Sequence, residues 1–191
     1  MPSRIEPVAP GEADSDDVNQ FLQEAAEGWY EDSAFFGAMA HQPVLLKRIA
    51  AALRRFPESD GLDPELLELM RLRVAAVHQC AYCGTVRTQA VREAVAPKED
   101  ALFGEEVDED ELTHREALAV RLAGEMSRDP QEISDEFFES LREEFTDDEL
   151  IELLLFASLE VGLDRFCIAL RLDTTEDSPY PTGLEYPLDR S

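Results

Sequence analysis

The sequence has very few lysines and a large excess of acidic side chains. Among 17 basic residues only Lys47 and Lys98 are lysines, whereas aspartate and glutamate together number 43, and the formal net charge is -26. Proteins that bind nucleic acids carry stripes of lysine and arginine that neutralise phosphates. The charge of this chain therefore argues against a nucleic-acid partner.

Long apolar runs are also missing. The longest apolar stretches, such as Leu153 to Ala157, are far too short to span a bilayer. The first residues contain no basic region followed by an apolar run, so we expect no signal peptide. We therefore expect a cytoplasmic protein with no membrane partner.

Cysteine is scarce, and its placement is informative. The chain has three cysteines, too few for a structural disulfide framework, and two of them lie in Cys80-Ala81-Tyr82-Cys83. On a helix, two residues at this spacing have Cα atoms roughly 5 Å apart, which suits a disulfide. A CxxC pair inside a cell more often serves redox or metal chemistry than structure. The spacing indicates thiol–disulfide exchange.

The acidic residues are spread along the whole chain and are not gathered in one tail. A surface with so many carboxylates repels itself at low salt and needs counterions to relax. The composition resembles that of proteins from salt-in halophilic archaea. An acidic mesophilic protein, or an acidic face that binds a partner, is the alternative.

Length and composition predict one globular domain, because 44% of the 191 residues are hydrophobic. We expect a flexible acidic N-terminal arm over residues 1–16, a single helical domain over 17–173 and an extended proline-containing tail over 174–191. Every strong apolar pattern has a helical period, and none has the alternation of a strand. The predicted fold class is an all-α bundle.

Local signals place several helix starts. Asp63-Pro64 supplies an N-cap and a first helical residue, while Thr113 and Thr146 each open a capping box. The last of these helices should run to about Arg171. We expect the helix that carries the two cysteines to continue to about Ala94.

Three further expectations concern side chains. The helix that begins at Pro43 should present one apolar face, made of Val44, Leu45, Ile49 and Leu53. In the final helix, Cys167 should belong to the core. Asp164 should be a surface or interface charge.

The motifs resemble those of the alkyl hydroperoxidase D-like (carboxymuconolactone decarboxylase) superfamily. The matching pieces are Phe36 to Pro43, Leu66 to Leu69, Arg71 to Ala75 and Cys80 to Cys83, and the final helix looks like the closing helix of that family. The resemblance implies a helical homo-oligomer: a dimer, trimer or hexamer. It also implies a thiol-dependent peroxidase or disulfide reductase, with a role in antioxidant defence.

The resemblance also implies roles for individual residues. Cys83 would attack a small-molecule peroxide, Cys80 would resolve the sulfenic acid as a disulfide, and Glu68 would take part in proton transfer. Two family histidines are replaced, one by Arg87 and one by Tyr82. Arginine stays protonated, so Arg87 can stabilise a thiolate but cannot act as a base. No bound cofactor or metal is expected; an external dithiol or lipoyl-type reductant would reopen the disulfide.

The position of Glu68 sets a geometric condition. In one unbroken helix, twelve residues would separate Glu68 and Cys80 by about 18 Å. Glu68 can approach the thiols only if the chain turns between them, near His78-Gln79, or if another subunit supplies it. Otherwise Glu68 is a solvated or salt-bridged helix residue.

Several other interpretations stay open. The fold could carry a lactone-type decarboxylase, which does not need CxxC, or the protein could be a non-catalytic helical oligomer. The two cysteines could be small buried apolar residues. A zinc site could be drawn from His78, Cys80, Cys83 and His114, although no second CxxC exists to complete it. His78 could instead simply end the helix before the cysteines.

Overall fold

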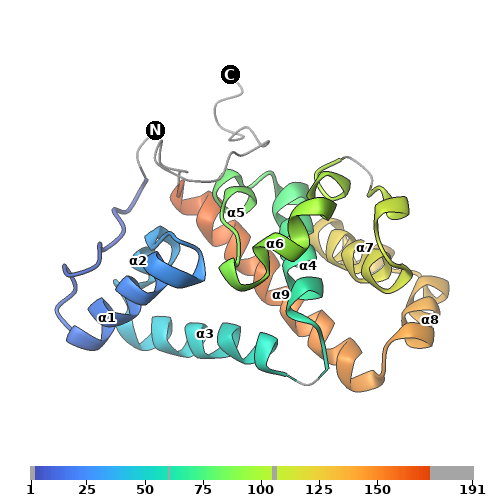
Figure 1. Ribbon diagram of the computed structural model, residues 1–191, viewed down its shortest axis with the longest axis horizontal. Helices are drawn as coiled ribbons and strands as arrows, with labels where there is room; N and C mark the ends of the chain where they lie inside the picture. Colours follow the sequence, from blue (N-terminus) through green and yellow to red (C-terminus); the bar gives the residue numbers. More distant parts are fainter. Residues whose placement is uncertain (1–2, 60, 105–106, 173–191) are drawn as a thin grey trace.

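The computed structural model describes residues 3–59, 61–104 and 107–172. These residues form helices and connecting turns, and no strand occurs among them, so the predicted all-α fold class is confirmed. Figure 1 shows the helices in chain order. Their bounds are α1 Asp16–Glu24, α2 Ala34–Met39, α3 Pro43–Arg55, α4 Pro64–His78, α5 Ala81–Thr85, α6 Arg92–Val95, α7 His114–Arg128, α8 Asp135–Glu144 and α9 Asp147–Leu170.

Helix α4 is the centre of the bundle. It packs against α7 and α9, and every side chain from Leu66 to Ala75 is buried. A helix that is covered on all sides needs partners for its charged residues as well as its apolar ones. Three charged residues, Glu68, Arg71 and Arg73, lie within this buried stretch. The core therefore contains the Glu68–Arg71 ion pair at its centre.

The predicted helix starts are confirmed. Asp63 is the N-cap of α4, with Pro64 as its first residue. Both capping boxes are complete: the Thr113 side chain accepts from the backbone N–H of Glu116, and the Thr146 side chain accepts from that of Glu149. These signals predict well because they depend only on residues three positions apart.

Two helix predictions are wrong in detail. Helix α3 buries Leu46, Ala50 and Leu53, whereas Val44 and Leu45 are 72% and 57% exposed. Helix α5 ends at Thr85, and Val86 has an extended backbone with ψ of 150°. The chain after it forms a 3-10 turn over Gln89–Val91 and then α6, so no continuous helix reaches Ala94.

The N-terminal segment lies against the helical domain. The backbone N–H of Arg4 donates to Leu170 O at 2.8 Å, and that of Val8 donates to Gly37 O at 3.1 Å. A Cβ at Gly37 would stand 2.5 Å from Val8 O, so this close approach requires glycine. The arm predicted over residues 1–16 therefore meets both α2 and the end of α9. The tail predicted over 174–191 lies outside the described residues.

No helix in the described parts of the chain is both long and apolar enough to cross a membrane.

The exposed apolar side chains bear on assembly. Val44 and Leu45 project from the start of α3, while Ile151 and Leu155 project from α9 and are 59% and 56% exposed. Apolar patches on a surface often mark contacts between proteins.

Homo-oligomer formation stays a prediction: light scattering in molar KCl should give a mass above the 21.5 kDa of one chain. A Leu45→Gln/Leu155→Gln variant should shift that mass downward, and a monomeric parent protein would contradict the prediction.

Candidate functional site

The cysteine pair lies at the junction of α4 and α5. Gln79 has a left-handed backbone with φ of 55°, which ends α4 and turns the chain, so the chain does turn at His78-Gln79, one of the two conditions set for Glu68. Cys80 is the N-cap of α5, and its sulfur accepts the backbone N–H of Cys83 at 3.3 Å. The two cysteines form a disulfide with their Cα atoms 5.3 Å apart. The two cysteines are therefore covalently paired in this structure.

The two sulfurs differ in their surroundings. Cys80 is 1% exposed and Cys83 is 6% exposed. Cys83 borders a small cavity of about 20 Å³ at the face of α9. The lining residues are Tyr30, Phe35, Arg71, Tyr82, Cys83, Val86, Glu160, Leu163, Asp164 and Cys167. Neither Glu68 nor Arg87 is among them.

Glu68 is held by Arg71 and does not face the sulfurs. The Arg71 Nε and Nη2 atoms donate to the two Glu68 carboxylate oxygens at 2.8 and 2.6 Å, and Thr88 donates to the same oxygens through its backbone N–H and its hydroxyl. Burial alone would raise the pKa of Glu68, but the Arg71 charge and these hydrogen bonds outweigh it and lower that pKa. Glu68 is therefore an ionised anchor.

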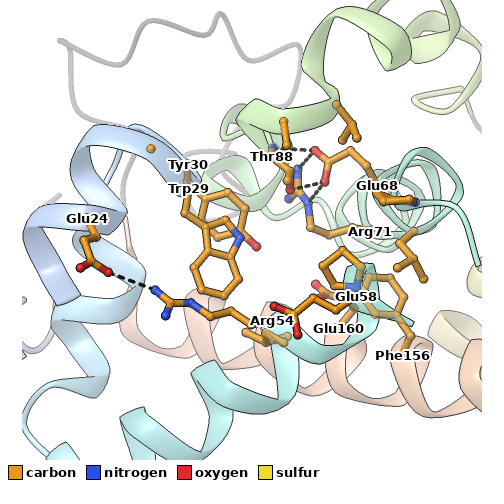
Figure 2. A pocket seen from close by; sticks show the side chains of 17 residues that line it. Glu24, Trp29, Tyr30, Arg54, Glu58, Glu68, Arg71, Thr88, Phe156 and Glu160 are labelled. Atoms are coloured by element: carbon orange, nitrogen blue, oxygen red, sulfur yellow. Dashed lines mark hydrogen bonds and ion pairs between the residues drawn. The ribbon is translucent and has the colours of Figure 1, made fainter. Parts of the chain in front are cut away.

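Arg71 links Glu68 to the end of helix α5, which carries Cys83. Its Nη1 donates to the Cys83 carbonyl oxygen at 2.8 Å, and its Nη2 donates to the Val86 carbonyl oxygen at 2.7 Å. These carbonyls belong to the end of the short helix α5, where the last turn has no helical donors of its own. The guanidinium also lies 5.6 Å from the Tyr30 ring centroid. Figure 2 shows the Glu68–Arg71 pair with Thr88 beside it, and the Arg71 contact with the Cys83 carbonyl oxygen links Glu68 to the cysteine pair.

Arg87 lies outside the helix that carries the cysteines, because α5 ends two residues before it. Its guanidinium instead pairs with both Glu99 carboxylate oxygens at 2.8 and 2.9 Å. Arg87 Nη1 donates to the Gly84 and Val86 carbonyl oxygens. Arg87 closes the end of α5 and ties it to the 3-10 segment Ala96–Ala101, which follows α6 and contains Glu99.

Tyr82 takes a structural place as well. Its hydroxyl donates to Asp32 Oδ1 at 2.6 Å and accepts the backbone N–H of Phe35 at 3.2 Å. Burial first, and then the nearby Asp32 carboxylate, raise the pKa of Tyr82 well above its ordinary value. Tyr82 is a neutral phenol that fixes α5 against the start of α2.

The zinc set considered from the sequence is not assembled. Within the described ranges, the cluster of candidate side chains contains Cys80, Cys83 and Asp164, and neither His78 nor His114 belongs to it. His114 is exposed at the start of α7. The disulfide also withdraws both sulfurs from coordination.

Comparison with known proteins finds a family match over part of the chain. Residues 45–103, which include all of α4 and α5, match the model of the carboxymuconolactone decarboxylase family. This match supports the motif-based resemblance to the alkyl hydroperoxidase D-like (carboxymuconolactone decarboxylase) superfamily.

Solved structures support the AhpD-like fold over nearly the whole chain. One is the alkylhydroperoxidase AhpD core of an uncharacterized peroxidase-related protein from Ralstonia eutropha JMP134, with a TM-score of 0.70 and 19% identity over 90% of this chain and 95% of that chain. Another is an uncharacterized peroxidase-related protein from Silicibacter sp. TM1040, with a TM-score of 0.73 and 17% identity over 93% of this chain and 96% of that chain. A search of curated proteins found no match.

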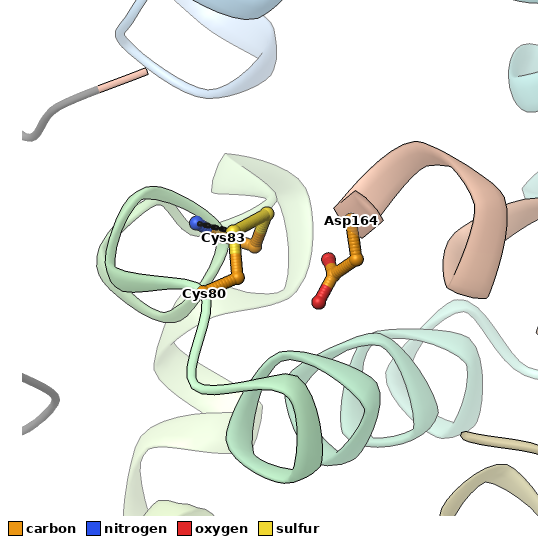
Figure 3. Close-up of side chains that lie close together, drawn as sticks. All are labelled: Cys80, Cys83 and Asp164. Carbon is orange, nitrogen blue, oxygen red and sulfur yellow. Dashed lines mark hydrogen bonds between the residues drawn. A yellow bond between two sulfur atoms is a disulfide. The ribbon is translucent and has the colours of Figure 1, made fainter. Parts of the chain in front are cut away.

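The AhpD-like chain also brings Asp164 to the disulfide, against the prediction that Asp164 is a surface or interface charge. Asp164 is 2% exposed, and a carboxylate oxygen of Asp164 lies within 4.8 Å of both sulfurs (Figure 3). The signal was present in the sequence. Leu153, Ala157, Glu160, Asp164 and Cys167 follow the helical period, so the two acids share the buried face of α9. The predicted burial of Cys167 is confirmed.

Glu160 lies one turn before Asp164 in α9 and is also buried. Burial is the main cause that raises the pKa of Glu160 to about 8, while Arg71 lowers it and Asp164 and Glu68 raise it further. Glu160 is therefore mostly protonated at neutral pH. It is a neutral carboxyl group at the boundary between two cavities.

The second cavity of this AhpD-like protein is a pocket of about 600 Å³ between the N-terminal helices and α4. Figure 2 shows Trp29, Arg54 and Phe156 along its walls, with the Glu68–Arg71 pair at one side. Tyr30, Arg71 and Glu160 line both this pocket and the cavity at Cys83. These shared side chains are the partition between the pocket and the redox pair.

Proposed function

We propose that the protein is a thiol-dependent peroxidase that cycles through the Cys80–Cys83 disulfide. The observation that carries the proposal is the disulfide itself, formed within one short turn with Cys83 facing a cavity. The superfamily and its peroxidase-related structural neighbours support the same reading. The larger pocket meets the cavity at Cys83 at Tyr30, Arg71 and Glu160, so movement of these side chains would give a small peroxide its approach to Cys83.

In the proposed cycle, the Cys83 thiolate attacks one peroxide oxygen, the O–O bond breaks and Cys83 becomes a sulfenic acid. Water or an alcohol leaves. The Cys80 thiol then attacks the Cys83 sulfur, and a second water leaves as the disulfide forms. An external dithiol, for which a lipoyl-type compound is a candidate, reduces the disulfide by exchange. The cycle suits an antioxidant role in a reducing compartment such as the cytoplasm.

The test is to trap the sulfenic acid in single-cysteine variants. We expect Cys80→Ser to leave a thiol that hydrogen peroxide oxidises, and its sulfenate should persist because the resolving partner is absent. Cys83→Ser should abolish trapping. The measurement is mass spectrometry after reaction with a sulfenate-specific reagent, with Cys167→Ser as a control for a buried cysteine outside the pair.

Two outcomes would contradict the proposal in different ways. Sulfenate on Cys80 in place of Cys83 would reverse the two roles, while no reaction at either cysteine would remove the peroxidase function.

The decarboxylase alternative has its own readout. A Cys80→Ser/Cys83→Ser protein that retains activity toward lactones would favour that alternative, since such chemistry does not need the pair.

A further inference from the structure

The replacement of the family histidines leaves the redox pair without the base that the family resemblance predicts. Arg87 cannot accept a proton and faces Glu99, and Glu68 is held in its ion pair with Arg71. A thiol must still lose its proton before it attacks, and a departing thiolate must regain one. Some other group near the sulfurs has to serve this purpose.

Asp164 is placed to accept and return the thiol proton. Its carboxylate lies within 4.8 Å of both sulfurs, and it projects from α9 directly toward the disulfide, as Figure 3 shows. Its Oδ2 atom is buried and has no hydrogen-bond partner among the described residues, and His78 Nδ1 lies 3.4 Å from it. The other His78 nitrogen, Nε2, lies 3.3 Å from the Ser127 carbonyl oxygen. This second contact fixes the ring in an orientation that faces Asp164.

We propose that the Asp164 carboxyl group is the proton acceptor and donor of the Cys80–Cys83 pair, and that His78 is its positioning residue. This inference rests on the redox cycle proposed above. The distance to the sulfurs is longer than a hydrogen bond, but opening the disulfide frees each sulfur to turn toward the carboxylate. Contacts of this kind commonly tighten during reaction.

The proton balance closes in both directions. During peroxide reduction, the Cys83 thiol gives its proton to the Asp164 carboxylate. The thiolate then attacks the peroxide, the O–O bond breaks, and the departing alkoxide or hydroxide takes the proton from Asp164. During disulfide reduction, an external thiolate attacks Cys83, the Cys80–Cys83 bond breaks, and the departing Cys80 thiolate takes a proton from the Asp164 carboxylic acid. The second thiol of the external dithiol then attacks its own sulfur in the mixed disulfide; it gives its proton to the Asp164 carboxylate, and the released Cys83 thiolate takes a proton from water. The external dithiol supplies both electrons and leaves as a disulfide.

Burial supports this role. It raises the pKa of Asp164, and the neighbouring His78 partly offsets the rise. A raised pKa brings the carboxyl group closer to a thiol in acidity, which makes proton exchange between them easier. The titratable groups that face Asp164 come from several elements: His78 and Arg71 from α4, Cys80, Tyr82 and Cys83 at α5, Glu160 and Cys167 from α9, and Tyr30.

The test measures disulfide reduction, which needs no peroxide. Oxidised full-length protein is mixed with dithiothreitol, and thiol formation is followed by rapid alkylation and mass spectrometry. We expect Asp164→Asn to be slower by about 100-fold, the usual size of a general-acid contribution. Asp164→Glu, which keeps the carboxyl group, should recover most of the rate. Glu160→Gln removes the neighbouring buried carboxyl group and should change the rate by less than about threefold.

The pH profile distinguishes proton transfer from a structural effect. The wild-type rate, divided by the concentration of dithiothreitol thiolate, should fall as pH rises through the pKa of Asp164, because the acid form is consumed. That fall should be absent in Asp164→Asn. In His78→Gln it should move to higher pH, since His78 lowers the pKa of Asp164. This variant also keeps the test decisive if Asp164→Asn does not fold.

Three results would overturn the inference: an Asp164→Asn rate equal to or above that of wild type, an unchanged pH profile in that variant, or an equal loss in Glu160→Gln. The two proposals fail separately. If no sulfenate is trapped but the disulfide of Asp164→Asn is reduced more slowly than that of the wild type, the protein is a disulfide reductase that uses Asp164. If sulfenate is trapped normally and the two disulfides are reduced at equal rates, the protein is a peroxidase and Asp164 has no role in proton transfer.

Discussion

Replacing Arg71 by methionine should lower the free energy of unfolding by about 3–5 kcal/mol, the usual cost of leaving one partner of a buried ion pair alone. Both Arg71 and Glu68 are buried, and Glu68 keeps only the Thr88 donors once the guanidinium is gone. The Cys83 and Val86 carbonyl oxygens also lose the Arg71 donor, and the Val86 oxygen then keeps Arg87 Nη1. Thermal or denaturant unfolding measures the loss.

Two comparisons isolate the cause. Arg142→Met removes a surface arginine that pairs with Glu139 and Asp147, and it should cost no more than about 1 kcal/mol. Glu68→Gln/Arg71→Met removes both charges and should be more stable than Arg71→Met alone. An Arg71→Met protein as stable as the wild type would mean that the buried pair makes no net contribution to stability.

The stability that Arg71→Met loses relative to the wild type should depend on pH. In the wild type the pKa of Glu68 is lowered, so its ion pair stabilises the fold above the ordinary glutamate pKa of 4.5, and this contribution is lost as pH falls through the lowered value. Without Arg71, burial dominates and raises the Glu68 pKa. Protonation then neutralises the buried carboxylate, so the stability deficit should be largest at neutral pH and should shrink toward pH 4.

Salt should stabilise the protein strongly. The segment from α8 to the start of α9 shows why, because Arg142 is the one exposed basic residue there. The exposed acids around it are Asp135, Glu136, Glu139, Glu143, Glu144, Asp147 and Asp148. Relief of about 3 kcal/mol of repulsion would raise the melting temperature by on the order of 10 °C for a chain of this size.

The shape of the salt response is the control. The Debye length falls from about 30 Å at 0.01 M to about 3 Å at 1 M, so screening should deliver most of the gain below molar KCl. General salting-out would instead rise steadily at higher concentrations. Repeating the series at pH 4, where many carboxylates are protonated, should flatten it. If the melting temperature at neutral pH does not change with KCl concentration, the acidic composition is better explained as that of a mesophilic protein.

Much of the fold was accessible from the sequence because its signals are local. An N-cap at Asp63 and capping boxes at Thr113 and Thr146 each involve residues within one helical turn. The CxxC spacing likewise sets a Cα separation that a disulfide can bridge, whatever surrounds it. The turn after His78 was inferred from the need to shorten the distance between Glu68 and Cys80.

The chemistry around the pair depended on the tertiary structure. Three features could not be read from spacing: Arg71 joining Glu68 to the Cys83 carbonyl, Arg87 turning to Glu99, and Asp164 reaching the sulfurs from more than eighty residues away along the chain. Each depends on how separate helices pack, and local sequence does not specify that packing. The sequence determined the helical class and the spacing of the cysteine pair; only the packing of α9 on α4 and α5 decided which charged groups surround that pair.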